Sequence, residues 1–288
     1  MRNLLTAFFI VNVVSLFAQQ ATPWERVAPP GSTVYTELRA ALKEPEVVYR
    51  MELNAIDILK ERKQLEKLNK LNNLTALRLN NQDWVEVPTP FLYLSGLVYF
   101  SAANIPLTHC NDSVALWGQL KFAEFSGTNF DTLPLSFNGW TRLLHLSVIG
   151  NKDTMQILNE SGTHKELQEL KLYRNHLITG WDSVFSFPAL KKLVVYKSGW
   201  KAIPQGILQH GVLEELWLDS NNIATVPSLI WQMKSLKILS LRNNSITRVH
   251  HNICFLMQLQ VLDLRGNPMD PYDVRCLQAL LPQCRILY

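Results

Sequence analysis

The sequence predicts an α/β fold in which about eleven parallel strands stack into a solenoid that is capped by a helix at each end. One observation behind this prediction is a pattern that occurs twice within Leu213–Val249, its second copy beginning 23 residues after the first. In each copy two leucines stand two residues apart, so on an extended strand both side chains point to the same side. One such unit cannot bury its apolar edge alone, so it must stack on neighbours.

The second observation is that the same spacing continues along most of the chain. Successive units begin 22 to 26 residues apart, and most of the intervals are 23 residues. A period held over so many units is strong evidence for a repeat architecture. The predicted units begin at Val48, Leu74, Leu97, Leu120, Leu143, Leu167, Leu190, Leu213, Leu236, Leu259 and Leu281.

Written out, each of the two clearest copies reads L-x-x-L-x-L-x-x-N-x-I, which resembles the leucine-rich repeat family. In the first copy the pattern is carried by Leu213, Leu216, Leu218, Asn221 and Ile223. The resemblance implies a right-handed, horseshoe-shaped solenoid whose strands line a concave face. It also implies that the protein binds another macromolecule, with a protein as the favoured partner.

The Asn at position 9 of the unit is expected to bond to backbone groups where the chain leaves the strand. It is kept at Asn151, Asn175, Asn221, Asn244 and Asn267, but is replaced by Gln82, Ile105, Thr128 and Ser198. A continuous ladder of Asn side chains is therefore predicted only toward the C-terminal end.

The second half of each unit is predicted to form short helical turns on the convex side. An apolar residue followed by Pro recurs there, and Pro removes a backbone donor and fixes φ, which suits a segment outside the strands. The pairs are Val87–Pro88, Leu133–Pro134, Ile203–Pro204 and Val226–Pro227.

Residues 1–18 are predicted to be a signal peptide. Arg2 gives a positive start, Leu4–Phe17 is nearly all apolar, and Ala18 is a small residue suited to cleavage. The apolar run is too short to span a bilayer, so an uncleaved anchor is the weaker alternative. Export to the periplasm or the exterior is therefore expected, with no membrane span left in the mature protein.

Residues 19–47 are predicted to form a lead-in and a capping helix. Three prolines make Gln19–Gly31 an ordered arm or a loose lead-in, and Ser32 or Thr33 is then expected to cap a helix that Pro45 ends. This stretch, "TELRAALKEPEVVYRMEL", resembles the lead-in of bacterial extracellular leucine-rich repeat proteins.

Residues 48–269 are assigned to the repeats, two of which are irregular. The first is long, and Leu65, Leu68 and Leu71 suggest a longer convex helix. The unit that begins at Leu143 has neither the Pro nor an apolar position 11, where it holds Asp153, so a bulged loop is expected.

Residues 270–288 are assigned to the C-terminal cap. Asp270 is predicted to cap a helix with Pro271 in its first turn, and Val274, Leu277 and Leu280 form its apolar stripe. Leu281, Cys284 and Ile286 then fit a last strand.

Composition and motifs exclude several classes of function. The net charge of +4 is mild and gives no reason to expect nucleic acid. No catalytic or phosphate-binding motif occurs in a recognisable frame, so no catalytic residue and no cofactor are predicted. His250 and His251 are adjacent, a spacing that rarely converges on one metal, so no metal site is predicted.

The cysteines fall into two groups. Cys110 and Cys284 take core positions and are interpreted as small buried hydrophobes. Cys254 and Cys276 each stand five residues before a unit begins, so they occupy equivalent positions on adjacent coils. A disulfide between them is geometrically allowed; two unpaired thiols are the favoured alternative, and pairing of Cys276 with Cys284 is a weaker one.

The candidate binding surface is the concave face. Residues at positions 3, 5 and 7 must point away from the core because side chains alternate along a strand. Aromatic residues with basic neighbours concentrate on the middle strands, a composition typical of binding hot spots. The candidate residues are Tyr99, Phe122, His145, Lys171, Tyr173, Lys192, Tyr196, Trp217 and Arg242.

The sequence leaves three alternatives for the function. A protein partner is favoured by the mixture of charges, whereas a glycan or surface-adhesion role would also suit a face rich in Tyr and Trp. An enzyme with an unrecognised site is the third. Neither the identity of the partner nor the oligomeric state follows from the sequence.

Overall fold

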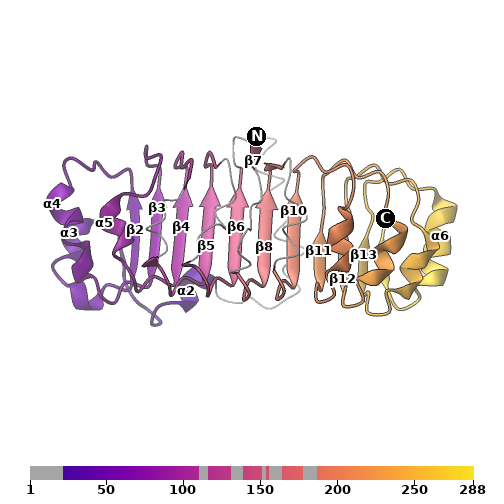
Figure 1. Cartoon of the computed structure of the whole chain (residues 1–288), viewed down its shortest axis with the longest axis horizontal. Helices are drawn as coiled ribbons and strands as arrows, with labels where there is room; N and C mark the ends of the chain where they lie inside the picture. The colour runs from indigo at the N-terminus through magenta and orange to yellow at the C-terminus, as the bar shows by residue number, and fades with distance from the viewer. Residues whose placement is uncertain (1–21, 110–115, 131–138, 151–153, 156–163, 178–186) are drawn as a thin grey trace.

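The computed structural model describes residues 22–109, 116–130, 139–150, 154–155, 164–177 and 187–288. Within them, twelve strands form one parallel sheet that runs along the elongated molecule (Figure 1). All but the first of these strands are the predicted ones. The strands are β1 (Val34–Tyr35), β2 (Arg50–Asn54), β3 (Ala76–Asn80), β4 (Tyr99–Ala103), β5 (Phe122–Ser126), β6 (His145–Ile149), β8 (Glu169–Tyr173), β10 (Lys192–Tyr196), β11 (Glu215–Trp217), β12 (Ile238–Ser240), β13 (Val261–Asp263) and β14 (Arg285–Leu287).

The register of the sheet repeats from strand to strand. Leu193 pairs with Leu170 on one side and with Leu216 on the other, and all three side chains are fully buried. Lys192, Glu215 and Trp217, which alternate with these leucines, are half-buried on the opposite face. We call that opposite face, formed by repeat positions 3, 5 and 7 of β2 to β14, the strand face; it corresponds to the concave face expected above.

Short helical turns cover the other side of the sheet, as the Pro pattern predicted. Pro88, Pro204 and Pro227 each stand directly before such a turn. The first unit has two short turns in place of the single longer helix expected, although Leu65, Leu68 and Leu71 are all buried. The turns are α4 (Arg62–Leu65), η2 (Leu68–Lys70), α5 (Thr89–Leu92), η5 (Gln205–Gln209), η6 (Ser228–Gln232) and η7 (His251–Phe255). The pair Leu133–Pro134 lies outside the described residues.

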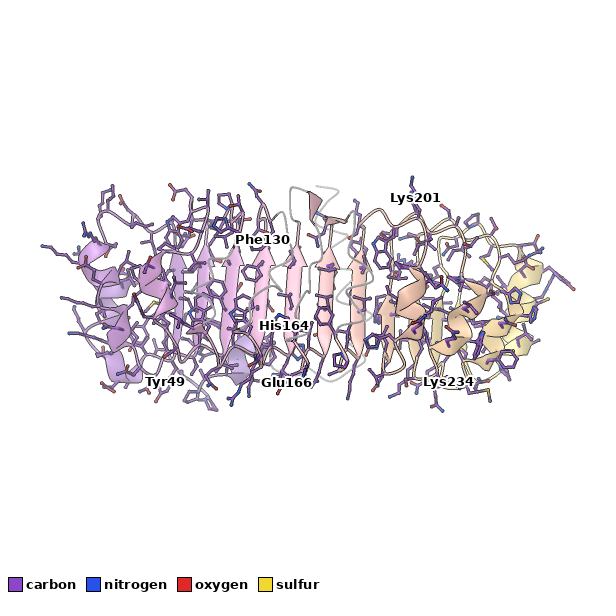
Figure 2. The ribbon with its side chains drawn as sticks, in the orientation of Figure 1. Tyr49, Phe130, His164, Glu166, Lys201 and Lys234 are labelled. Atoms are coloured by element: carbon purple, nitrogen blue, oxygen red, sulfur yellow. The ribbon has the colours of Figure 1, made fainter. Side chains whose placement is uncertain are left out.

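The core between the two layers is one continuous cluster that extends from Leu38 to Leu281. Its middle part is unusually aromatic, with Trp117 stacked on Trp140 at 6.3 Å between ring centroids. Phe130 and His164, labelled in Figure 2, are fully buried in the same layer. The buried His164 and His210 contact the backbone carbonyl oxygens of Trp140 and Phe187, so both imidazoles have polar partners inside the core.

Among the described residues the Asn ladder is present where the sequence predicted it, and the predicted Asn151 lies outside them. Asn221 donates to the carbonyl oxygens of Val195 and Leu218, and its Oδ1 accepts from the backbone nitrogen of Ser198 at 3.0 Å. Asn244 and Asn267 bond to the backbone in the same way. These buried amides satisfy backbone groups that the turn leaves unpaired. At the other end Gln82 substitutes for Asn by accepting from the backbone nitrogen of Ile56 at 2.8 Å.

The chain leaves each strand through a left-handed residue at position 8 of the unit. Asn81, Asn104 and Asn243 occupy this position with φ between 54° and 56°, and glycine occupies it in three other units. Asn and Gly are the residues that adopt this conformation at least cost. The remaining units hold Ala55, Arg174, Lys197 and Ser220 there, also at positive φ.

The N-terminal segment differs from the prediction in two ways. Val34–Tyr35 does not belong to the capping helix but forms β1, which pairs with β2 at the edge of the sheet. The helix, α3 (Leu38–Ala41), begins only after this strand, and η1 (Pro45–Val47) follows it. Upstream, α2 (Pro23–Arg26) lies against the strand face near β4 and β5 (Figure 1).

Two further features complete the fold. β7 (Thr154–Met155) of the irregular unit pairs with β9 (His176–Leu177) of the next unit in a separate two-stranded sheet, whereas Asp153 lies outside the described residues. At the C-terminus, α6 (Pro271–Leu280) begins after Asp270, whose carboxylate accepts from the backbone nitrogen of Tyr272 at 2.7 Å. Val274 and Leu277 are buried as predicted, but Leu280 is exposed because α6 turns that side to solvent at the end of the stack.

Candidate functional site

The candidate site lies on the strand face of β6, β8, β10 and β11. The fixed register brings the predicted residues together here, because Tyr196 pairs with Tyr173 and Trp217 pairs with Val194 on adjacent strands. The Tyr173 and Tyr196 rings lie 5.9 Å apart. Both tyrosines and Trp217 are half-buried on the side away from the core. The outward orientation that the repeat register predicted is therefore present for these three aromatics.

Glu169 is the centre of a charge network on this face. Its carboxylate accepts from His145 Nδ1 at 2.7 Å and lies 2.9 Å from Lys171 Nζ and 3.7 Å from Lys192 Nζ. Burial alone raises the pKa of a carboxyl, but the His145 hydrogen bond and the two ammonium groups outweigh it and lower the pKa of Glu169 to about 2. Three predicted site residues are thus held by one carboxylate that the sequence analysis had not singled out.

Trp217 is fixed by polar contacts at its edge and at its face. Its Nε1 donates to Glu215 at 3.0 Å, and Lys192 Nζ lies 5.6 Å from the ring centroid. Lys192 also pairs with Glu215 at 2.9 Å. Because these contacts hold the indole in place before any partner arrives, little side-chain entropy remains to be lost on binding.

Tyr99 does not lie on an open surface, contrary to the prediction. It is only 1% exposed because Trp24 of α2 packs on it edge to face, with ring centroids 5.5 Å apart. Its hydroxyl donates to Glu124 at 2.6 Å. Burial, together with the negative charge of Glu124, raises the pKa of Tyr99 to about 12. Repeat register shows which side of the sheet a residue occupies, but not whether another segment covers it.

Phe122 marks the border between the covered and the open parts of the strand face. It packs against the cluster of Trp24, Ala76 and Tyr99 on one side. On the other side it stacks on His145 at 4.9 Å between centroids, with the planes 21° apart. The open surface therefore begins at Phe122 and continues over the Glu169 network toward β13.

Arg242 lies at the far end of this surface, beside two aspartates that the sequence analysis did not select. Its backbone nitrogen donates to Asp219 Oδ1 at 3.0 Å, and the hydroxyl of Ser240 donates to the same oxygen. Burial raises the pKa of Asp219. Asp263 is bound by the guanidinium of Arg265. The repeat register could have predicted that Asp219 and Asp263 point to the strand face, because each of them directly follows a consensus leucine.

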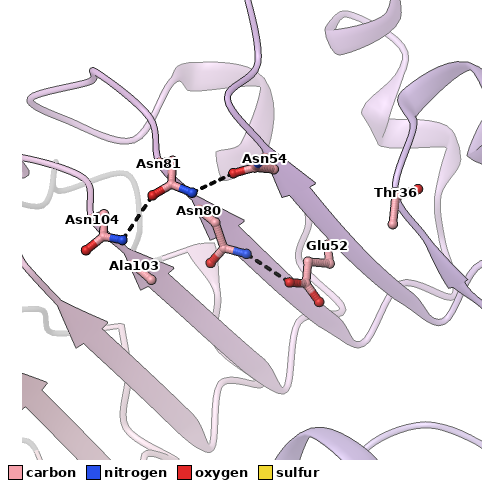
Figure 3. A pocket seen from close by; sticks show the side chains of 7 residues that line it. All are labelled: Thr36, Glu52, Asn54, Asn80, Asn81, Ala103 and Asn104. Carbon is pink, nitrogen blue, oxygen red and sulfur yellow. Dashed lines mark hydrogen bonds between the residues drawn. The ribbon is translucent and has the colours of Figure 1, made fainter. Parts of the chain in front are cut away.

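A shallow open depression of about 430 Å³ lies near the other end of the sheet, at the exits of β2 to β4. Figure 3 shows that its floor is a chain of amides in which Asn104 donates to Asn81 at 2.9 Å and Asn81 donates to Asn54 at 2.8 Å. These asparagines satisfy one another at the left-handed turns, so the depression is a consequence of the repeat geometry.

The remaining candidate chemistry belongs to the cysteines and to a pair of histidines in the C-terminal units. Cys254, Cys276 and Cys284 are free thiols there, and burial raises the pKa of Cys284 to about 11. The Cys254–Cys276 disulfide remains a prediction for the oxidised protein, and Cys110 lies outside the described residues. His250 and His251 are both exposed, with rings 4.1 Å apart. No group of three or more His, Cys, Asp or Glu side chains that could hold a metal occurs in the described ranges.

The same ranges contain no helix that is long and apolar enough to cross a membrane. The predicted signal peptide, residues 1–18, lies outside them.

Comparison with known proteins agrees with the fold. Residues 211–269 match a family model described as leucine rich repeat, while no curated protein sequence matches the chain. The leucine-rich repeat domain of the type III effector XopL is 21% identical with a TM-score of 0.67, and the match covers 96% of this chain and 93% of that one.

Two more solved structures are similar at lower identity. The plant peptide hormone receptor RGFR1 in complex with RGF2 is 17% identical with a TM-score of 0.58, over 92% of this chain and 47% of the receptor. An internalin from Listeria monocytogenes is 15% identical with a TM-score of 0.52, over 94% and 92% of the two chains. At these identities the neighbours establish the fold. The chain therefore has a leucine-rich repeat fold: residues 211–269 match the sequence model of the family, and the solved neighbours share the solenoid fold over nearly the whole length of the chain.

Proposed function

We propose that this chain is a non-enzymatic, exported binding module that recognises a protein partner through the open part of its strand face, from Phe122 to Arg242. Leucine-rich repeat folds commonly mediate protein–protein interaction, because a solenoid presents a long continuous surface. They are typically scaffolds for binding rather than catalysts. One neighbour, the receptor RGFR1, was solved with RGF2 bound to it.

One observation carries the proposal: Tyr173 and Tyr196 are in ring contact on the open face, and on the next strand Trp217 is held by Glu215 and Lys192. Tyr and Trp are enriched at the hot spots of protein interfaces. The ion pairs also offer charges of both signs, which favours a protein partner of mixed charge over a neutral glycan.

The test replaces residues on opposite faces of the sheet. Trp217→Ala and Tyr196→Ala should cost about 1 kcal/mol or less of folding stability, because both side chains face away from the core. Each should weaken binding of the partner by about 2 kcal/mol or more. Leu216→Ala should instead destabilise the fold by about 2–5 kcal/mol, because it leaves a cavity in the core.

The measurements are urea unfolding of each variant and a titration with a partner captured from the extracellular milieu. Tyr93→Ala is the matched control, since Tyr93 is 61% exposed and follows α5 on the convex side. If Trp217→Ala unfolds the protein as badly as Leu216→Ala, the assignment of the face is wrong. Unchanged binding by Trp217→Ala would place the site elsewhere, and selective binding to a glycan array would favour the glycan alternative.

Export is the second part of the proposal. It is supported by the apolar run Leu4–Phe17 followed by Ala18, which predicts a mature chain that begins at Gln19. Intact-mass measurement of the protein from the periplasm or the culture medium tests this directly. Recovery of the chain with Met1 in a membrane fraction would contradict it.

A further inference from the structure

We propose that the strand face holds a second binding site, which accepts an aromatic residue of a protein partner and which the chain's own N-terminal arm fills in the present structure. The arm is residues 22–31, and the site beneath it is formed by Ala76, Arg78, Tyr99 and Phe122. The inference rests on the proposed function only in taking the partner to be a protein.

The arm is anchored mainly by one side chain. Trp24 is 6% exposed, and the guanidinium carbon of Arg78 lies 4.1 Å from the centroid of its ring. Tyr99 meets the same ring edge to face, with planes 68° apart. The indole thus makes a cation–π contact and an edge-to-face aromatic contact, and these depend on geometry in a way that burial of apolar surface alone does not.

Two residues of the site beneath the arm, Tyr99 and Arg78, are held in place by neighbouring side chains of the sheet and not by the arm. The Tyr99 hydroxyl is fixed by Glu124 at 2.6 Å, and Arg78 lies 3.8 Å from the carboxylate of Glu52. Both contacts come from the sheet itself, so they persist when the arm leaves. A site that is preorganised in this way loses little entropy when a new side chain enters.

The arm itself contributes little rigidity. Its α2 is a single turn closed by a capping box, in which Thr22 accepts from the backbone of Glu25 and the carboxylate of Glu25 accepts from the backbone nitrogen of Thr22 at 2.7 Å. A helix of this length is not stable alone in water. The arm therefore stays folded because Trp24 is docked, and it can be displaced by a competitor.

The arm also lies apart from the structural core. Trp24, Ala76 and Tyr99 form a cluster of their own, with Val27 and Phe122 at its rim, on the opposite face of the sheet from the main core. Removing Trp24 therefore opens the strand face without opening the interior. Phe122 belongs to this rim and also stacks on His145, so the covered site adjoins the surface proposed above.

The sequence of the arm indicates what a competitor looks like. Trp24 is the buried aromatic residue of the docked arm, and the guanidinium of Arg78 lies over its ring. The ligand class is therefore a peptide segment that presents a Trp or a similar aromatic residue.

The experiment uses the full chain and a synthetic peptide with the sequence of residues 22–31, labelled for fluorescence anisotropy. In the parent protein the tethered arm competes at an effective concentration of the order of millimolar. The Trp24→Ala protein has no such competitor, so it should bind the peptide at least about ten-fold more tightly than the parent does. A peptide with Ala in place of Trp should lose this binding, as should an added Arg78→Ala change.

Trp217→Ala in the Trp24→Ala background is the matched control, because this substitution alters the open surface and leaves the covered site intact. The double variant should bind the peptide as tightly as the Trp24→Ala protein does. Equal peptide binding by the parent and by Trp24→Ala, or no binding to Trp24→Ala at about 1 mM peptide, would overturn the inference. Neither result depends on the partner, so failure here is distinguishable from failure of the proposed function.

A second variant, which keeps Trp24, tests the same site if the Trp24→Ala protein does not fold. A protease site inserted after Gly31 allows the arm to be cut after folding. Release of the cut arm by excess peptide on size exclusion, with the solenoid still folded, supports the site. Retention of the arm under the same excess would overturn it.

Discussion

Trp217 owes its place on the strand face to its neighbours in sequence. Leu216 and Leu218 are both fully buried, so the residue between them must point the other way. A large apolar side chain in this position gains little from folding alone, and it is held by Glu215 and Lys192 instead. Residues fixed by polar contacts on an open face are the ones that a partner can use.

Glu169 gives the site a defined dependence on pH. Its pKa of about 2 in the folded protein lies below the ordinary value of 4.5, so its contacts stabilise the fold fully above pH 4.5. This contribution, on the order of 2–3 kcal/mol, is lost as the pH falls from 4.5 to 2. In urea unfolding, Glu169→Gln should lower the stability at pH 7 and flatten the acid limb of the stability curve.

Glu214→Gln is the control for this experiment. Glu214 pairs with Lys237, and that hydrogen bond also lowers its pKa, but the carboxylate is far more exposed than that of Glu169. The control should therefore change the stability little. An acid limb that is the same in Glu169→Gln and in the parent would contradict the central role of Glu169.

At the scale of the repeat, position 8 requires a positive φ, and some units place a residue there that is poorly suited to it. Lys197 occupies it at φ 51°, whereas other units use Asn or Gly. A residue with a Cβ and no short polar group pays about 1–2 kcal/mol for this conformation. Lys197→Asn should therefore raise the free energy of unfolding by about 0.5–1 kcal/mol, measured by urea titration.

The reverse change at the same repeat position should be costly. Gly266 has φ 71°, and a Cβ there would collide with the side chain of Asn243 in the preceding unit. Gly266→Ala should destabilise the protein by about 1–3 kcal/mol. Stabilisation by Gly266→Ala, or destabilisation by Lys197→Asn, would show that these turns are not under the strain inferred.

Much of the fold could be predicted because each unit repeats the same pattern of core leucines, followed in most units by an Asn or another polar residue. Leucines two residues apart determined the strands, and Asn221, Asn244 and Asn267 determined the turns that follow them. The strand at Val34–Tyr35 was missed because a two-residue strand has no period of its own. It exists because β2 offers an unpaired edge.

The candidate site was predictable only in part, for a related reason. Alternation along a strand placed Tyr173, Tyr196 and Trp217 correctly on the strand face. It could not show that Trp24, which lies 75 residues before Tyr99 in the sequence, packs on Tyr99. Contacts between a non-repeating arm and a repeating sheet leave no periodic signal, so only the structure reveals them.

At the scale of the whole molecule, the units form a one-dimensional array whose two ends are capped by different elements. The N-terminal end is closed by α3 and β1, and the C-terminal end by α6 and β14. In such an array each unit contacts only its neighbours, so stability is a sum of local terms. The proposed binding surface in the middle of the sheet is therefore expected to be insulated from changes at either end.

Asp270 allows this insulation to be measured. Its carboxylate caps α6, and replacement of such a cap by Ala typically costs about 0.5–2 kcal/mol. Because α6 covers the last apolar surface of the stack, Asp270→Ala should increase hydrogen exchange most in β14 and β13, less in β11, and not at all in β3. Hydrogen exchange followed by mass spectrometry at the level of single strands provides the measurement. An equal increase in β3 and β13 would show that the twelve strands unfold as one cooperative unit, and a partner bound in the middle would then stabilise both ends alike.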